Sequence, residues 1–209
     1  MQRIIKKLYI LAIITIIVFL ASWFYQHHTT NQHMLNNARR VAQLSAQTLS
    51  EDLSGWITSN AHTIKAASSF IALERWSDDD ILSYLTILLD NNEAFYTIYY
   101  GTADNRMLNA SGWIPPQDFD CRERAWYQDA SSSGNTIISN AFVNASNDRV
   151  IVTIASPVHN SDEELLGVVA GDICVSKLVS VLDNRDFKQH GINFLIDGDN
   201  HIIAHPEVN

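Results

Sequence analysis

The sequence is poor in cysteine and in basic residues, and both shortages exclude classes of protein. Only two cysteines occur among 209 residues, which excludes a small fold held by several disulfides and a cysteine-rich zinc module. Lysine and arginine total 14 against 23 acidic residues, for a net charge of -9. We therefore expect no nucleic-acid partner, because such a partner requires clustered positive charge.

Catalytic motifs are missing as well. The sequence contains no Gly-x-Ser-x-Gly, His-Glu-x-x-His or paired Cys-His pattern, which are arrangements that activate a nucleophile or bind a catalytic metal. We predict no catalytic residue, no metal site and no cofactor in this chain, and a function other than catalysis.

A long apolar run near the start is the first positive feature. Leu8 to Tyr25 contains no charged residue, and at about 1.5 Å per residue such a helix nearly crosses a hydrocarbon core of about 30 Å. The next basic residue after the run is Arg39, whereas three precede it: Arg3, Lys6 and Lys7. The positive-inside rule then predicts residues 1–7 in the cytoplasm, a transmembrane helix over 8–25, and the rest of the chain outside. A cleaved signal peptide is the alternative, but its apolar region is usually only about 7–15 residues long.

Residues 26–75 contain no proline and a single glycine, Gly55. Apolar or small residues recur there at intervals of three and four, which is the spacing of one helix face. The sequence therefore predicts one long stalk helix over this range. The face comprises Leu35, Ala38, Ala42, Ser45, Leu49, Leu53, Trp56, Asn60, Ile64, Ala67 and Ile71. Such a face suits pairing with a second copy or packing against the protein's own sheet, and we expect both, with a homodimer formed through the membrane-near turns.

The remaining chain predicts a second helix and a sheet. The helix is expected to begin at Ser77, whose hydroxyl can cap it, while the three aspartates that follow favour the positive end of the helix dipole. Beyond residue 92 the pattern changes to short β-rich runs separated by turn residues. The predicted strands are Phe95–Tyr100, Met107–Ser111, Ile137–Phe142, Arg149–Val158 and Leu165–Cys174, the last two forming a hairpin. The fold class is therefore α+β, with an antiparallel sheet behind a long helix.

The last stretch carries another hairpin signal. A short helix is predicted over 177–182 and a hairpin over 194–204. An isolated strand pair buries too little apolar surface to be stable by itself. We therefore interpret residues 186–209 as the truncated start of a second, membrane-proximal module that follows a first module at 76–185. An edge hairpin that completes the first sheet is the alternative.

The most informative stretch runs from Trp113 to Tyr127, because it places an arginine, an indole and a phenol close together in a predicted loop. Arg124 can clasp a carboxylate in a bidentate fashion, and the indole N–H of Trp126 adds a neutral donor. Asp172 lies in an apolar predicted strand, where a carboxylate needs a cationic partner or a pocket. These residues suggest a site for a zwitterion. An internal salt bridge, with Trp126 and Tyr127 in the core, is the alternative.

The ordered set of these features resembles the extracytoplasmic double-Cache sensor domains of bacterial chemoreceptors, diguanylate cyclases and sensor histidine kinases. The resemblance rests on the anchor and long helix, on the segment DFDCRERAWY at 118–127, on GVVAGDI at 167–173, and on DNHIIAHP at 199–206. It implies a PAS-like sheet, a location in the bacterial inner membrane with most of the chain in the periplasm, and an output domain outside this sequence. A membrane-anchored structural domain without a small-molecule ligand is the alternative function.

Within that family, the amino-acid-binding branch has an arginine and a tryptophan that hold the ligand carboxylate, and tyrosines and an aspartate that hold its ammonium group. The resemblance assigns these roles to Arg124, Trp126, Tyr127 and Asp172, with Phe119 and Phe142 standing where two further tyrosines are expected. It implies an amino acid as the ligand, or else an amine or another small carboxylate. The two phenylalanines should make the pocket more apolar and favour larger apolar side chains.

Cys121 and Cys174 would meet oxidising conditions outside the cell. A disulfide between them requires Cα atoms within about 7 Å, and the sequence leaves this open.

Overall fold

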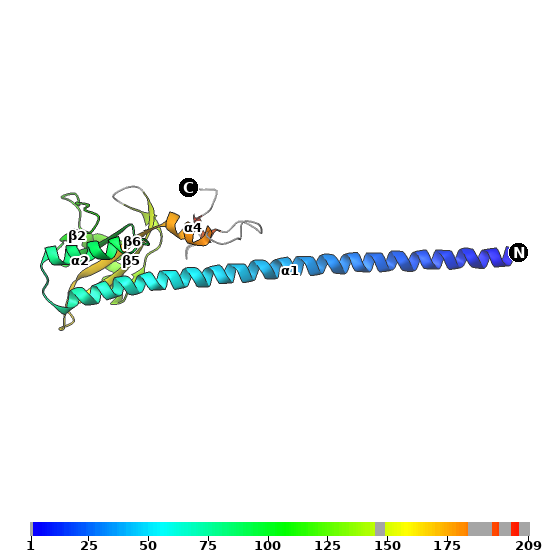
Figure 1. Cartoon of the computed structure of the whole chain (residues 1–209), viewed down its shortest axis with the longest axis horizontal. Helices are drawn as coiled ribbons and strands as arrows, with labels where there is room; N and C mark the ends of the chain where they lie inside the picture. Colours follow the sequence, from blue (N-terminus) through cyan, green and yellow to red (C-terminus); the bar gives the residue numbers. More distant parts are fainter. Residues whose placement is uncertain (1, 145–148, 184–193, 197–201, 205–209) are drawn as a thin grey trace. The chain divides into compact units, whose positions relative to one another are not determined.

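The computed structural model describes residues 2–144, 149–183, 194–196 and 202–204 (Figure 1). The chain divides into two compact units, Met1–Ser50 and Glu51–Asn209. Helix α1, Gln2–Leu73, runs through both without a break, which confirms the long helix predicted over 26–75.

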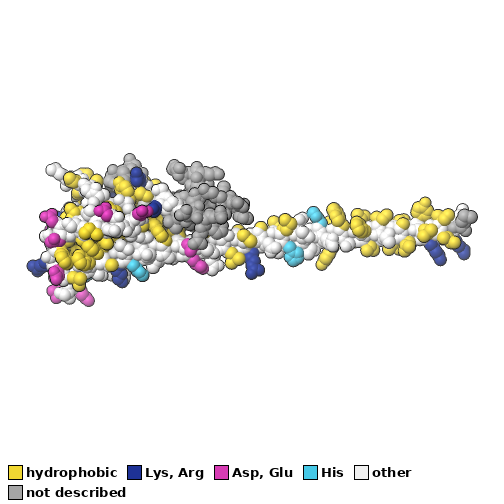
Figure 2. Space-filling view, viewed as in Figure 1, with side chains coloured by type: hydrophobic (Ala, Val, Ile, Leu, Met, Phe, Trp, Pro, Cys, Tyr) yellow, Lys and Arg dark blue, Asp and Glu magenta, His cyan; other side chains and the backbone are white. Residues whose placement is uncertain are grey.

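The first unit consists of the N-terminal part of α1. In the described chain α1 is the one helix long and apolar enough to cross a membrane. Its large apolar side chains from Ile4 to Tyr25 are exposed, and Figure 2 shows them along the helix. This surface fits lipid better than water, because a soluble monomer rarely exposes so large a contiguous apolar patch.

Helix α2, Asp78–Asp90, begins where the sequence predicts. Ser77 is its N-cap, the Ser77 hydroxyl accepts a hydrogen bond from the Asp80 backbone N–H, and the Asp80 carboxylate accepts one from the Ser77 backbone N–H. This capping box satisfies two backbone donors that a helix start leaves unpaired.

A six-stranded antiparallel sheet forms the centre of the second unit, in the order β2-β1-β6-β5-β3, with β4 also paired to β5. Its strands are β1 Thr97–Thr102, β2 Met107–Asn109, β3 Ile137–Ile138, β4 Phe142–Val143, β5 Val150–His159 and β6 Leu165–Cys174. The predicted β5–β6 hairpin is confirmed by its register, from Ile151↔Cys174 to His159↔Leu165.

The single strand predicted over 137–142 is wrong, because two short strands replace it. Ile138 pairs with Ile154 and Phe142 pairs with Ile151. An advance of four residues from β3 to β4 therefore corresponds to an advance of three residues along β5. An extra residue of this kind interrupts a ladder. Ser139 bridges the gap, since its hydroxyl accepts a hydrogen bond from the Thr153 backbone N–H at 2.9 Å.

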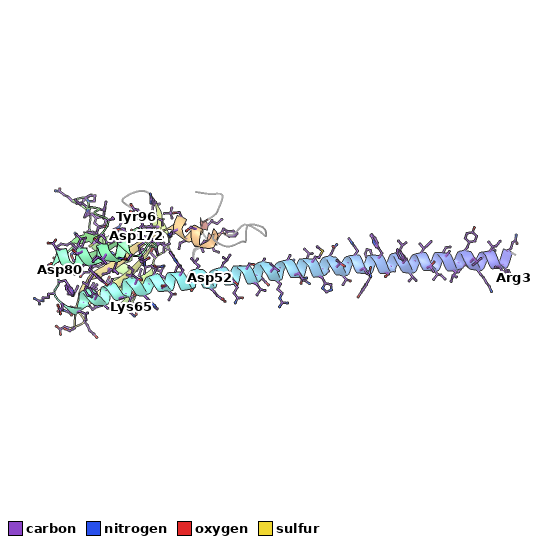
Figure 3. The ribbon with its side chains drawn as sticks, in the orientation of Figure 1. Arg3, Asp52, Lys65, Asp80, Tyr96 and Asp172 are labelled. Atoms are coloured by element: carbon purple, nitrogen blue, oxygen red, sulfur yellow. The ribbon has the colours of Figure 1, made fainter. Side chains whose placement is uncertain are left out.

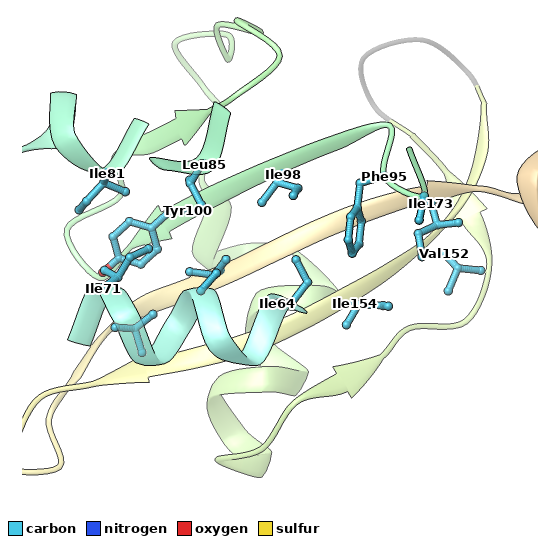
Figure 4. Close-up of a cluster of buried hydrophobic side chains, with 14 of the residues drawn as sticks. Ile64, Ile71, Ile81, Leu85, Phe95, Ile98, Tyr100, Val152, Ile154 and Ile173 are labelled. Carbon is cyan, nitrogen blue, oxygen red and sulfur yellow. The ribbon is translucent and has the colours of Figure 1, made fainter. Parts of the chain in front are cut away.

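Helices α1 and α2 cover one face of the sheet and enclose the larger core (Figure 4). Ile64 of α1 and Leu85 of α2 are fully buried there. They meet alternate residues of the strands, as a pleated sheet requires; these include Ile98, Ile154 and Ile173. At Gly171 a Cβ atom would lie 2.6 Å from the Phe95 ring, so the strand needs glycine at this point.

The opposite face of the sheet is covered by a short 3-10 helix, η1 Cys121–Glu123, and by α3, Ala125–Ser133. The loop predicted over 113–127 is therefore wrong for most of 121–127, whereas 113–120 forms neither helix nor strand. Nine residues that include three serines give too weak an apolar period to indicate a helix, yet Trp126, Tyr127 and Ala130 are buried against the sheet. Gly134, with φ of 64°, ends α3 in the left-handed conformation that favours glycine.

One polar link crosses the larger core. The Ser68 hydroxyl of α1 lies 3.0 Å from the Ser156 hydroxyl of β5, and both are buried. Thr136 donates from its own hydroxyl to the same Ser156 oxygen, also at 3.0 Å. The three hydroxyls satisfy one another in an apolar layer, as buried polar groups must.

The second unit ends in helix α4, Val175–Asp183, and in a two-stranded antiparallel sheet of β7, Leu195–Ile196, and β8, Ile202–Ala204. The predicted hairpin forms, but it does not join the six-stranded sheet. Its predicted turn at 197–200 lies outside the described residues, as does most of 186–209. The assignment of this stretch to a second module stays a prediction.

Candidate functional site

A pocket opens on the α3 side of the sheet. Its empty space, with the open mouth included, is about 470 Å³. Strands β1, β2, β4, β5 and β6, the segment before α3 and α3 itself contribute side chains. The lining residues are Tyr96, Thr97, Tyr99, Met107, Asn109, Ser111, Trp113, Phe119, Arg124, Trp126, Phe142, Asn144, Ile151 and Asp172.

Asp172 is held in this pocket by the pleat of β6. The Ile173 side chain packs in the helix-covered core, and a Cβ atom on Gly171 would meet Phe95 and Ile64 there, so the Asp172 side chain between them points to the other face. Figure 3 labels Asp172 together with Tyr96, whose backbone N–H donates to the Asp172 carbonyl at 2.7 Å. The position of this carboxylate follows from the sheet register rather than from a loop.

Three neutral donors hold the Asp172 carboxylate, which is 4% exposed. Oδ1 accepts from the Thr153 hydroxyl at 2.7 Å and from the Tyr99 hydroxyl at 2.9 Å. Oδ2 accepts from the Asn144 amide at 3.1 Å. Among the described residues no cationic side chain pairs with it.

Burial therefore dominates the titration of the site. It raises the pKa of the Asp172 carboxyl to about 6, although the hydrogen bonds from Thr153 and Tyr99 favour the charged form. Burial, followed by the negative charge of Asp172, raises the pKa of the Tyr99 phenol well above its usual value. The Tyr99 phenol thus stays protonated and donates its hydrogen bond. The ionised Asp172 is a buried carboxylate that a positively charged group would stabilise.

Arg124 supplies the opposite charge. It is the N-cap residue of α3 and is half-buried, and its guanidinium carbon lies 5.8 Å from the centre of the Phe119 ring. Trp126 packs edge-on against Tyr99, with ring centres 5.1 Å apart. Within the described part of the chain, Arg124 forms no ion pair.

The pocket brings together most of the residues singled out from the sequence. Arg124, Trp126, Asp172, Phe119 and Phe142 all line it. Tyr127 does not, because its ring lies in the smaller core with Cys121 and Ala130.

The internal salt bridge considered as the alternative is not formed, since Arg124 and Asp172 line one pocket without pairing. The possible disulfide is not formed either, because Cys121 and Cys174 are both free thiols.

Sequence reasoning missed the polar residues that complete the pocket. Tyr99, Thr153 and Asn144 surround Asp172 although they are 73, 19 and 28 positions away in sequence. The signal that could have found them is the pairing of the strands, because Thr97 of β1 and Thr153 of β5 lie directly opposite Asp172 of β6. The hydrophobic pattern of the sequence does not give this pairing.

This arrangement can bind a small molecule that carries both charges. A carboxylate would meet the Arg124 guanidinium, and an ammonium group would meet Asp172. The described residues contain no group of three His, Cys, Asp or Glu side chains that could hold a metal ion.

Comparison with known proteins supports a sensory role. A sequence model of the Cache domain matches residues 26–209. The chain is 23% identical over 202 residues to the methyl-accepting chemotaxis protein PscA of Pseudomonas syringae pv. tomato, which covers 97% of this chain and 32% of the relative. It is 32% identical over 113 residues to the methyl-accepting chemotaxis protein PctB of Pseudomonas aeruginosa, covering 54% of this chain and 18% of the relative. The chain thus spans about a third or less of the length of these relatives.

Two solved structures from Pseudomonas aeruginosa have a similar fold. The ligand-binding domain of the amino-acid chemoreceptor PctC, in complex with GABA, gives a TM-score of 0.70 at 26% identity and covers 82% of this chain and 77% of that domain. The ligand-binding domain of PctB, in complex with L-Arg, gives a TM-score of 0.66 at 28% identity, with 74% and 65% covered. Both are ligand-binding domains of amino-acid chemoreceptors.

Proposed function

The chain belongs to the Cache domain family, and on this basis we propose that it is the extracytoplasmic sensor region of a bacterial transmembrane receptor. Its ligand in this proposal is an amino acid, or a related amine or small carboxylate. The observation that carries the proposal is that Arg124 and Asp172, two opposite charges in one pocket, form no ion pair with any side chain that the structure describes. A buried carboxylate without a cation is costly, and a zwitterionic ligand removes that cost.

The ligands of the similar domains support this assignment. GABA and L-Arg each carry a carboxylate and an amino group, and they occupy the PctC and PctB domains respectively. In this chain Arg124 and the Trp126 indole would hold the carboxylate, and Asp172 would hold the ammonium group.

The proposal extends to the signalling role. The relatives are methyl-accepting chemotaxis proteins, so we place the chain in a receptor that passes ligand occupancy through α1 to a cytoplasmic output domain. A diguanylate cyclase or histidine kinase output is compatible with the same sensor region. The membrane-distal module at 76–185 would be followed by a second module that starts at 186, which is the double-Cache arrangement.

Topology is part of the proposal. Residues 1–7 would lie in the cytoplasm, 8–25 in the inner membrane and the rest in the periplasm, with a homodimer formed through α1. The charge asymmetry around the apolar run supports this orientation. Fusions at Asn209 test it: an export-dependent reporter should be active there, and activity of a cytoplasm-only reporter would contradict it.

The ligand site is tested by two substitutions and a matched control. Arg124→Ala and Asp172→Ala should each weaken amino-acid binding about 10- to 100-fold, since each removes a charged hydrogen-bond partner. Arg122→Ala is the control, because Arg122 is exposed and pairs with Asp120 at 2.6 Å. Calorimetric titration of the full chain in lipid nanodiscs supplies the affinities.

Two results would reject the proposal. One is unaltered affinity in both variants, which would place the ligand elsewhere. The other is the absence of saturable binding across amino acids, amines and short carboxylates, which would favour a structural membrane-anchored domain.

A further inference from the structure

Asn109 is a buried polar residue of the pocket for which the Arg124–Asp172 pair gives no role. It ends β2 beside Tyr99 of β1, lines the pocket and is 9% exposed. In an antiparallel ladder, residues directly opposite each other project to the same face of the sheet. Asn109 therefore lies on the ligand side, as Tyr99 does.

Hydrogen bonds fix which end of the Asn109 amide is available. Its Oδ1 accepts from the Ser111 backbone N–H at 2.9 Å, and from the hydroxyls of Ser111 and Thr97 at 2.7 and 2.8 Å. A backbone N–H is always a donor, so the atom that faces it must be the oxygen and the amide cannot be flipped. The amino group then carries the two remaining protons.

Those protons have no partner within the described residues. The Asn109 Nδ2 atom makes no hydrogen bond there, whereas its oxygen has three. A donor that is nine-tenths buried and unpaired costs free energy, and the pocket is the space that it borders. The geometry therefore suits an acceptor supplied by the ligand.

We propose that the Asn109 amino group is a specificity-determining donor that binds an oxygen on the ligand side chain. This inference rests on the proposed function, in which Arg124 and Asp172 take the two charged groups that every amino acid carries. A third, neutral donor distinguishes among amino acids. The ligand class is then an amino acid with an oxygen acceptor in its side chain, such as an amide or a hydroxyl group.

Phe119 and Phe142 by themselves favour ligands with apolar side chains, whereas the Asn109 donor favours ligands with a side-chain oxygen. The two predict opposite preferences. Ligand pairs of similar size but different polarity distinguish them: asparagine with leucine, threonine with valine, and glutamine with methionine. The wild-type chain should bind the oxygen-bearing member of at least one pair about tenfold more tightly, which corresponds to one good hydrogen bond.

Asn109→Leu is the decisive variant, because it removes the donor without adding a group that could accept from a ligand amide or hydroxyl. The preference for the oxygen-bearing member should then fall to about onefold or reverse. Asn135→Leu makes the same change at an exposed residue outside the pocket lining and should keep the wild-type ratio.

The measurement is the ratio of dissociation constants within each ligand pair, by calorimetric titration of the full chain in nanodiscs. The ratio of two dissociation constants does not depend on the fraction of folded protein, so it can be measured even for a variant that is partly unfolded. Equal ratios in wild type and Asn109→Leu, or a wild-type preference for the apolar member of every pair, would overturn the inference. If no amino acid binds the wild type at all, the proposed function itself fails, which is a different result.

Discussion

The Tyr99 hydroxyl donates a 2.9 Å hydrogen bond to Oδ1 of Asp172 across the β1–β6 pair. Both side chains are buried, so the bond forms in a medium where charged hydrogen bonds are strong. Together with Thr153 and Asn144, Tyr99 therefore orients the carboxylate, and it supports the ionised form.

Tyr99→Phe should therefore weaken ligand binding at pH 7 by about tenfold and raise the pKa of Asp172 further. Tyr100→Phe is a matched control, because the Tyr100 hydroxyl donates to the Leu166 carbonyl at 2.9 Å, on the other face of the same strand. Calorimetric titration of both variants decides the matter, and equal losses in the two would show that the effect is one of stability alone.

The pH dependence of binding follows from the Asp172 pKa of about 6. An ammonium ligand needs the ionised carboxylate, so its affinity should fall about tenfold between pH 7 and pH 5. Asp172→Asn should bind more weakly and lose this dependence. A wild-type affinity that stays flat across the range would mean that Asp172 does not meet the ligand's positive charge.

Stability without ligand should change in the opposite direction. The folded-state pKa of Asp172 lies above its unfolded value, so the native state binds more protons between about pH 4 and 6. The contribution of Asp172 to stability is then highest below pH 4 and falls by about 2 to 3 kcal/mol as the pH rises through 6. Urea unfolding of wild type and Asp172→Asn at pH 5 and pH 7 measures this effect. Relative to wild type, the unfolding free energy of Asp172→Asn should be higher at pH 7 than at pH 5.

Gly101 on β1 leaves room for the indole of the site. A Cβ atom there would lie 3.0 Å from Cη2 of Trp126 and 3.1 Å from Sγ of Cys121. Gly101→Ala should displace Trp126, destabilise the fold by about 1–3 kcal/mol and reduce ligand affinity. Gly55→Ala, with nothing within 4 Å of the added methyl group, should instead stabilise its helix by up to about 1 kcal/mol. Chemical denaturation compares them, and a neutral Gly101→Ala would show that the indole has space to move.

The two pocket phenylalanines offer a gain-of-function test. Phe119 packs edge-on against Trp113 at 5.2 Å and lies beneath Arg124, while Phe142 lines the pocket from β4. Phe119→Tyr and Phe142→Tyr should tighten binding of small amino acids more than of large ones, by about 0.5–1.5 kcal/mol for each hydroxyl that reaches the ligand. Glycine and leucine affinities in both variants are the readout, and a uniform shift would argue against direct contact.

The sequence predicted those elements whose signals are local. Ser77 and Asp80 lie three residues apart, and their capping box places the start of α2. The β5–β6 hairpin is equally local, since a short polar turn joins two Val- and Ile-rich runs. Arg124, Trp126 and Asp172 could be singled out because their residue types are unusual in their surroundings, and they line one pocket; their contact with a ligand stays a prediction.

Features that depend on strand pairing could not be predicted in the same way. Asn109 and Thr153 are unremarkable polar residues until the register places them beside Thr97 and Asp172. Helix α3 was missed because its stability comes from burying Trp126 and Tyr127 against the sheet, and tertiary packing of this kind overrides weak local propensity. The place of Tyr127 could not be predicted for a related reason, since an aromatic residue of a short motif can lie in the core, as it does here, or in the pocket.

The hydrogen bond between Ser68 and Ser156 limits how α1 can move against the sheet within the second unit. Apolar contacts change gradually as two surfaces slide, whereas a 3.0 Å hydroxyl pair is lost within about 1 Å of displacement. Ser68 would then keep only its bond to the Lys65 carbonyl, and Ser156 only the bond from Thr136. Small axial shifts of α1 in this region must therefore carry β5 with them. Because β5 also bears Thr153, which donates to Asp172, the hydroxyl pair couples the axial position of α1 to that of the Asp172 carboxylate.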